Sequence, residues 1–358
     1  MDRFPPRRFC VAPMLDCTDR HARHLMRLIS RHAWLYTEMV TTGALLRGQP
    51  ERWLTYSAIQ HPLALQLGGS DPAALARCAI LAQAWGYDEV NLNVGCPSDR
   101  VQGGQFGACL MAEPARVADC VAAMAAVVRI PVTVKTRLGI DDLDNDAHLH
   151  HFVATVAAAG CRTFIIHARK AWLKGLSPHE NRTVPPLQYE RVHRLKAAMP
   201  DLEIILNGGL TDLDAARVAG EGLDGVMLGR AIYDSPYRLA GVDACFYGDA
   251  HPVPDRVDVV HTYGVHAQGE LTSGTPLNAL TRPLLGLFNG LPGARAFRRH
   301  LSEQVCRPGA GWAVVEHALA AFCRADVPVQ SASSGSGERF QSRRLGETAG
   351  ETEWERSY

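Results

Sequence analysis

A repeat of strand-like and helix-like segments constrains the fold of this chain more than any other feature of the sequence. Short apolar and β-branched segments alternate with longer segments of helical period, at a spacing of roughly 30 residues. Strands buried on both faces need this composition, and eight such units close a parallel barrel. The sequence therefore predicts an α/β fold, a TIM (β/α)8 barrel. The expected strands are residues 9–14, 35–40, 63–67, 89–94, 132–136, 163–167, 203–207 and 225–228.

The pattern changes after the eighth expected strand. Residues 249–254 are rich in proline and acidic residues, which is typical of a linker, and residues 256–324 have helical periods only. We expect a barrel domain over 9–248 and a C-terminal all-helical domain over 249–325. Residues 1–8 form an N-terminal extension, and the Ser-, Gly-, Glu- and Arg-rich tail 326–358 is expected to be disordered.

Composition restricts the surroundings and the partners of the chain. Lys and Arg together number 37, as do Asp and Glu, so a nucleic-acid surface would have to be a local patch. No apolar segment approaches the ~20 residues of a membrane span, and no signal peptide is evident at the N-terminus. We therefore expect a cytoplasmic protein with reduced thiols and no membrane association.

Residues 89–98 place a thiol at the end of the fourth expected strand. Apolar residues alternate there with Asn91 and Asn93, so the two amides point to the face opposite the apolar side chains. A glycine and a proline then end the strand around Cys96. The Cys96 thiol could act as a proton donor or a nucleophile. The alternative is an inert, buried cysteine.

Glycines and an arginine follow the last two expected strands. Asn207, Gly208 and Gly209 come after the seventh strand, and Gly229 and Arg230 come after the eighth. The loops at these positions of a barrel commonly bind phosphate, because glycines let backbone N–H groups approach an anion and arginine adds charge-assisted bonds. Two ordinary glycine turns are the alternative interpretation.

Three further polar side chains occur at or near the ends of buried strands. Lys135 needs an anionic partner, either a flavin ring or an acid such as Glu38. His167 follows an apolar strand and is either a ligand contact or a satisfied core group. Gln66 offers an amide that can donate to and accept from a ring edge. The histidines have no metal-ligand spacing, so we expect no metal.

A basic cluster lies in the expected helical domain. Arg295, Arg298 and Arg299 are spaced to share one face of a helix. The cluster itself is equally compatible with contacts to phosphate groups and with a solvated surface.

Several of these motifs resemble those of the bacterial tRNA-dihydrouridine synthases, and the similarity covers roughly residues 8–325. The segment 93–98 followed by 103–108 is highly specific to that family. The resemblance implies tightly bound FMN in the barrel, NADPH as reductant and a helical domain that holds tRNA. It also implies reduction of the 5,6-double bond of uridine in the tRNA D-loop. Similarity to the A-type subfamily, which modifies uridines 20 and 20a, rests on residues 36–44, 169–173 and 290–298.

The same resemblance suggests roles for individual residues. Cys96 would be the proton donor. The residues implied to bind FMN are Pro13, Met14, Leu15, Gln66, Lys135, His167, Asn207, Gly208, Gly209, Gly229 and Arg230. Those implied to contact tRNA are Asn93, His179, Arg182, Arg295 and Arg298.

Two positions depart from the family pattern, and one other function stays open. Relatives carry lysine where this chain has His179, and an aromatic residue is common in place of Cys17. We expect a monomer without protein partners, because tRNA needs an open face. The alternative function is a flavin-dependent reductase of a free pyrimidine or another small conjugated carbonyl compound. Such an enzyme would not need the helical domain.

Overall fold

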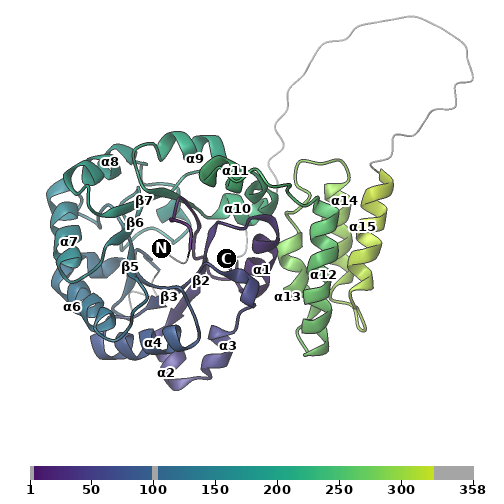
Figure 1. Ribbon diagram of the computed structural model, residues 1–358, viewed down its shortest axis with the longest axis horizontal. Helices are drawn as coiled ribbons and strands as arrows, with labels where there is room; N and C mark the ends of the chain where they lie inside the picture. The colour runs from purple at the N-terminus through teal and green to yellow at the C-terminus, as the bar shows by residue number, and fades with distance from the viewer. Residues whose placement is uncertain (1–3, 99–103, 326–358) are drawn as a thin grey trace, which may run out of the picture.

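The computed structural model describes residues 4–98 and 104–325 (Figure 1). The expected disorder of the tail 326–358 lies outside the described residues, as does the first residue of the 103–108 motif.

The strands form a closed parallel barrel, which confirms the predicted fold class. Each strand pairs with the next along the chain, and β1 pairs with β8 to close the ring. The strands are β1 (Phe9–Val11), β2 (Trp34–Thr41), β3 (Leu63–Gly68), β4 (Glu89–Val94), β5 (Val132–Arg137), β6 (Thr163–His167), β7 (Glu203–Asn207) and β8 (Gly225–Leu228).

Helices cover the outside of the barrel. Asp19 caps the first of them, because its carboxylate accepts the backbone N–H groups of His21 and Ala22. The long outer helices are α1 (Arg20–Ile29), α4 (Pro72–Ala84), α6 (Pro114–Ala125), α7 (Asp146–Ala158), α8 (Tyr189–Ala198) and α9 (Leu213–Ala219). Shorter helices are α2 (Thr42–Arg47), α3 (Pro50–Leu54), η1 (Ala58–Gln60), η2 (Gly107–Ala112), η3 (Glu180–Arg182), α10 (Arg230–Asp234), η4 (Pro236–Gly241) and α11 (Val242–Tyr247).

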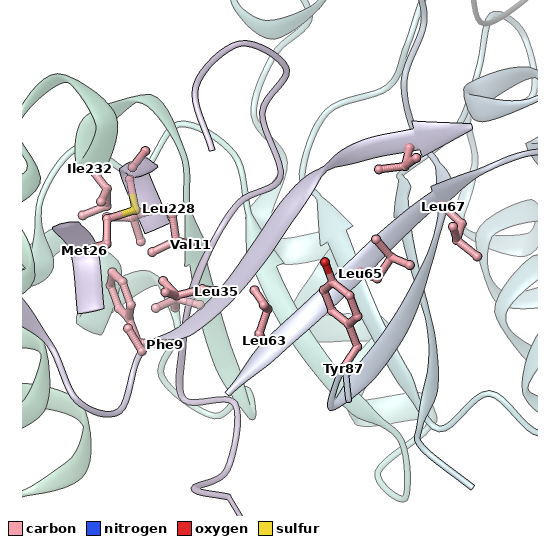
Figure 2. Close-up of a cluster of buried hydrophobic side chains, with 14 of the residues drawn as sticks. Phe9, Val11, Met26, Leu35, Leu63, Leu65, Leu67, Tyr87, Leu228 and Ile232 are labelled. Carbon is pink, nitrogen blue, oxygen red and sulfur yellow. The ribbon is translucent and has the colours of Figure 1, made fainter. Parts of the chain in front are cut away.

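Alternate residues of each strand face opposite sides of the barrel wall. Phe9 and Val11 pack in the apolar layer between the strands and the helices, close to Met26 of α1 (Figure 2). Cys10, between them in the sequence, belongs instead to a second buried cluster that includes Tyr36. This two-residue period fills the outer layer with aliphatic side chains and divides the inward positions between a smaller apolar cluster and polar residues.

The first strand is shorter than predicted, because it ends at Val11 instead of Met14. Pro13 has no N–H group to continue the ladder. Met14 instead forms a turn, in which its backbone N–H donates to Thr18 Oγ1 and its carbonyl accepts from the Thr18 N–H. The prediction was wrong for these residues, and the turn brings Met14 to the C-terminal end of the barrel.

The described elements after Gly248 are all helical, and Figure 1 shows them grouped beside α1 and α10. Contacts between α1 and the first of these helices join the two parts of the molecule. The helices are α12 (Arg256–Thr272), α13 (Leu277–Thr281), η5 (Arg282–Leu284), α14 (Ala294–Gln304) and α15 (Ala313–Ala325). Within the described ranges, no helix has the length and apolarity needed to cross a membrane.

An ion-pair network fills the N-terminal end of the barrel, and we call this region the closed end. Arg7 Nε lies 2.6 Å from Glu89 Oε2, and Arg7 Nη1 lies 2.9 Å from Glu203 Oε2. The Tyr36 hydroxyl donates to the other oxygen of Glu89, and Thr163 donates to Glu203. Burial lowers the pKa of Arg7, but the two carboxylates and Tyr36 outweigh it and raise the pKa above the ordinary value.

Candidate active site

A cavity of about 940 Å³ opens at the C-terminal end of the barrel, where enzymes of this fold have their active sites. This volume is large enough for a cofactor. Fourteen of the predicted site residues line it: Pro13, Met14, Leu15, Gln66, Asn93, Cys96, Lys135, His167, Arg182, Asn207, Gly208, Gly209, Gly229 and Arg230.

Three of the predicted tRNA-binding residues lie outside the cavity lining. His179 is exposed and immediately precedes η3, whose last residue, Arg182, lines the cavity. Arg295 and Arg298 are exposed on α14. Arg298 donates a hydrogen bond to the side chain of Asn289, which lines the rim of the cavity. The helical region therefore contributes to this rim.

Lys135 is the central cation of the cavity, and together with Arg137, His167 and Asn207 it forms what we call the open end. Its ammonium group donates to Asn207 Oδ1 at 3.0 Å. Burial, reinforced by Arg137, lowers its pKa to about 7. The alternative partner, Glu38, does not pair with Lys135, and its carboxylate accepts the backbone N–H of Asp16 instead. Among the described residues, no carboxylate lies within salt-bridge distance of Lys135, so the site favours an anionic ligand.

His167 packs against the glycine loop after β7. The side chain is buried, and burial together with Arg137 and Lys135 holds its pKa well below the ordinary value. Its imidazole is therefore neutral near pH 7. Gly208 has φ +108°, and a Cβ atom there would lie 2.3 Å from His167 Cδ2. Close packing of the imidazole thus requires glycine at this position, which the simple glycine-turn interpretation overlooks.

The loop that carries Cys96 is held from two sides. Asn93 Oδ1 accepts the backbone N–H groups of Gly95 and Cys96 at 3.1 and 3.0 Å. Arg137 Nε donates to the Gly95 carbonyl at 2.8 Å, and the Ala108 N–H donates to the Cys96 carbonyl at 2.9 Å. The half-buried Cys96 thiol lines the cavity and lies 3.5 Å from Ser98 Oγ. This arrangement fixes the backbone beneath the thiol.

Sequence reasoning assigned no role to Arg137, which joins two loops of the site. Besides Gly95, its guanidinium donates to the carbonyls of Lys170 and Asn181. It therefore ties the Cys96 loop to the loop that precedes Arg182. The inward alternation of β5, which places Lys135 inside the barrel, could have located Arg137. Its carbonyl partners could not be found in that way, because they belong to distant loops.

A histidine cluster lies where α1 meets α12. His21 Nδ1 is 3.1 Å from His266 Nε2, and together with Glu270 their ligand atoms lie within 4.8 Å of one another. Arg20 approaches both Glu270 Oε2 (2.5 Å) and His21 Nε2 (3.4 Å). A guanidinium in this position neutralises the carboxylate that a metal would need. We therefore interpret the cluster as a hydrogen-bonded joint. Sequence spacing could not reveal it, because its histidines are far apart in the chain.

A closed eight-stranded parallel barrel with a cationic, glycine-lined cavity at the C-terminal ends of its strands defines the class of protein: a (β/α)8-barrel enzyme. The family model described as "Dihydrouridine synthase (Dus)" matches residues 10–322. The chain therefore belongs to the dihydrouridine synthase family, a family of oxidoreductases.

Curated relatives are similar over most of the chain. The tRNA-dihydrouridine(20/20a) synthase of Shewanella oneidensis is 59% identical over 310 residues, which cover 87% of this chain and 92% of the relative. The enzymes of the same name from Vibrio cholerae and Escherichia coli K12 are each 57% identical. These two matches cover 87% of this chain, with 96% and 90% of the respective relatives.

Proposed function

We propose that this protein is an FMN-dependent enzyme that uses NADPH to reduce uridine to 5,6-dihydrouridine in the tRNA D-loop, at positions 20 and 20a. One observation carries the proposal beyond family membership. The thiol of Cys96 and the ammonium group of Lys135 line the same cavity, so a proton donor and an anion-binding cation serve one site. The names of the curated relatives support the substrate and the two positions.

The residues present fit a flavin mononucleotide. Lys135 lacks a carboxylate partner among the described residues, and its lowered pKa reflects the cost of charging it without an anion. Gly208, Gly209 and Gly229 line the side of the cavity next to Arg230, as a phosphate site requires. We infer that the residues that hold the cofactor are Pro13, Met14, Leu15, Gln66, Lys135, His167, Asn207, Gly208, Gly209, Gly229 and Arg230.

When bound by the residues named above, reduced FMN would supply the hydride that carbon 6 of the uracil ring accepts. The 5,6-bond of uracil is conjugated to a carbonyl, so hydride addition leaves an enolate that needs a proton at carbon 5. We assign that proton to the Cys96 thiol, whose loop is fixed by Asn93 and Arg137. General-acid help of this kind is worth about 10²–10⁴-fold in rate.

The target uridine must leave the base stack of the tRNA to reach a cavity inside the barrel rim. We propose that Asn93 and Arg182, which line the cavity, contact the extruded nucleotide. His179, Arg295 and Arg298 lie on exposed surface outside it and would contact the tRNA backbone. Contacts between these exposed groups and phosphates would make tRNA binding strongly dependent on salt.

The alternative is a reductase of free pyrimidines or other small conjugated carbonyl compounds. It would use the same cavity, Lys135 and Cys96. The link from Arg298 to Asn289 at the cavity rim favours the tRNA substrate, because a small molecule needs no basic helix beside the site. We further propose that the protein acts in the cytoplasm as a monomer.

Incubation of the purified protein with FMN, NADPH and tRNA from a strain that lacks dihydrouridine tests the proposal. Mass spectrometry of the digested tRNA should show uridines 20 and 20a each heavier by the mass of two hydrogen atoms. Cys96→Ala should oxidise NADPH at the normal rate but reduce uridine about 10²–10⁴-fold more slowly. Full activity of Cys96→Ala in a single turnover would show that Cys96 is not the proton donor. Reduction of free uracil but not of tRNA would favour the alternative.

A further inference from the structure

A chain of side-chain hydrogen bonds runs through the barrel from Glu89 at the closed end to Asn93 at the cavity. Thr133 Oγ1 donates to Glu89 Oε1 (2.5 Å), and Asn91 Nδ2 donates to Thr133 Oγ1 (2.8 Å). Gln66 Nε2 donates to Asn91 Oδ1 (2.8 Å), and Asn93 Nδ2 donates to Gln66 Oε1 (2.9 Å). All five side chains are at most 9% exposed, so protein groups supply their bonds.

The register of three neighbouring strands brings these residues together. Gln66 of β3 is the cross-strand partner of Asn91 on β4, and Asn91 is the partner of Thr133 on β5. The three side chains therefore form one row across the inner wall of the barrel. Glu89 and Asn93 lie two residues before and after Asn91, on the same face of β4.

A carboxylate at one end sets the direction of every bond in the chain. Glu89 pairs with Arg7 and accepts the hydroxyl of Tyr36, whose pKa is raised by burial and by Glu89 itself, so Tyr36 keeps its proton. The Glu89 carboxylate, paired with Arg7, acts only as an acceptor, and Thr133 must therefore use its single hydroxyl hydrogen on Glu89. The Thr133 oxygen is then left as an acceptor for Asn91.

The same reasoning continues to the cavity. Asn91 turns its NH₂ group toward Thr133, so its oxygen faces Gln66, and the NH₂ group of Gln66 must point to that oxygen. The Gln66 oxygen then accepts from Asn93 Nδ2. This leaves Asn93 Oδ1 facing the loop, where it accepts the N–H groups of Gly95 and Cys96. If the Asn93 amide were flipped, its NH₂ group would face these two N–H groups, and donors would then point at donors.

We propose that Glu89, acting through Thr133, Asn91 and Gln66, is a positioning residue that fixes the Asn93 amide and thereby the backbone of the Cys96 loop. The inference rests on the proposed function in one respect: the reaction that the Cys96 loop serves is the proposed reduction of uridine. It concerns four buried side chains, and the proposed function assigns a role to only one of them, Gln66. The same chain also fixes which edge of the Gln66 amide remains free for a ligand in the cavity.

Thr133→Val tests the proposal, because valine keeps the shape of threonine and suits a strand but can neither donate nor accept. Thr133→Ser restores the hydroxyl and should restore the wild-type behaviour. Thr163→Val is the matched control. Thr163 is buried at the start of β6 and donates to Glu203 in the same way. Among the described residues no hydrogen bond joins it directly to the three amides, and it reaches Glu89 only through Glu203 and Arg7.

The first readout is backbone hydrogen exchange at Gly95 and Cys96, measured on the full chain without substrate. In Thr133→Val these two amides should exchange about tenfold faster, the loss expected for one hydrogen bond, while Thr133→Ser and Thr163→Val should match the wild type. Wild-type exchange in Thr133→Val, or an equal rise in Thr163→Val, would overturn the proposal. So would unprotected Gly95 and Cys96 amides in the wild type, a result that needs no variant.

The second readout is the kinetics of tRNA reduction. Thr133→Val should lower kcat about tenfold and leave KM for tRNA within about twofold, because the loop beneath the donor is disturbed and the binding surface is not. An equal rate for Thr133→Val and the wild type would overturn the positioning role. Failure of the wild type to reduce tRNA would instead count against the proposed function, while the exchange experiment would still decide the role of Glu89.

Discussion

The two ends of the barrel interior use the same strands in opposite ways. At the closed end, Arg7 is paired with two carboxylates, and its neighbouring hydroxyls all have acceptors. At the open end, the half-buried Lys135 and the buried Arg137 donate to amide and carbonyl oxygens. No described carboxylate pairs with these two cations. A buried charge that is satisfied within the chain serves the fold, whereas one that lacks a counter-ion indicates a place for a ligand.

The largest expected effect belongs to the closed end. Glu89→Gln removes one of the two charges that pair with Arg7 and leaves it with Glu203 alone. This change should lower the free energy of unfolding by about 3 kcal/mol, since breaking a buried ion pair is costly. Urea unfolding followed by circular dichroism measures this loss. The double variant Arg7→Met/Glu89→Gln should lose less than the sum of the two single variants. Strict additivity would mean that the closed end is not a coupled ion pair.

The open end should respond in the opposite direction. Lys135→Met removes a half-buried cation that has no counter-ion among the described residues, so the ligand-free protein should be as stable as the wild type or more stable. Its affinity for FMN should fall about 10–100-fold, the range for a lost charged hydrogen bond. Urea unfolding and fluorescence titration of the flavin give the two values. A large loss of stability together with unchanged FMN affinity would assign Lys135 to the fold and remove the contrast between the two ends.

The pH dependence of stability sharpens the same contrast. The pKa of Lys135 is about 7 in the folded chain and 10.5 in its ordinary state, so between these values the unfolded chain binds a proton that the folded chain does not. Stability of the ligand-free protein should therefore rise from pH 7 to pH 10.5, by at most about 1.4 kcal/mol per pH unit. Below pH 7 this contribution is constant and unfavourable. The urea midpoint of the wild type relative to Lys135→Met isolates it, and parallel curves would refute the assignment.

The smallest effect is expected at the cavity rim. Arg298→Gln removes an exposed charge on α14 and should weaken tRNA binding only a few-fold at moderate salt. It should also reduce the salt dependence by about one counter-ion. Arg217→Gln removes an exposed charge from α9, outside the helical region, and serves as its control. Filter binding across a salt series compares them, and equal slopes for both variants and the wild type would exclude α14 from the tRNA surface.

Much of the open end could be predicted from local sequence. The alternation in residues 89–94 predicted that Asn91 and Asn93 face away from the apolar side chains of β4, and both amides are buried. The glycines after β7 and β8 line the cavity. These features depend on a period of two residues and on strand ends, which short segments define. The prediction that the first strand extends to Met14 was wrong. Thr18, four residues further on, forms hydrogen bonds with Met14 and so stabilises a turn there.

The closed end could not be predicted, since its contacts join distant segments. Arg7 meets Glu89 and Glu203 only after the barrel closes, and no local period connects them. The same holds for His21 and His266 in the joint with the helical region. Gly208 also depends on a distant residue, because a side chain at this position would collide with the imidazole ring of His167.

The central claim is that the open end binds an anionic cofactor. The visible spectrum of the purified protein tests this claim most directly, when it is measured before and after any chromophore is released by heat. We predict flavin absorbance equivalent to one FMN per chain, identified by mass after release. The wild type stripped of chromophore should recover it from added FMN, and Lys135→Met should recover much less. A colourless protein that does not bind added FMN would contradict the account.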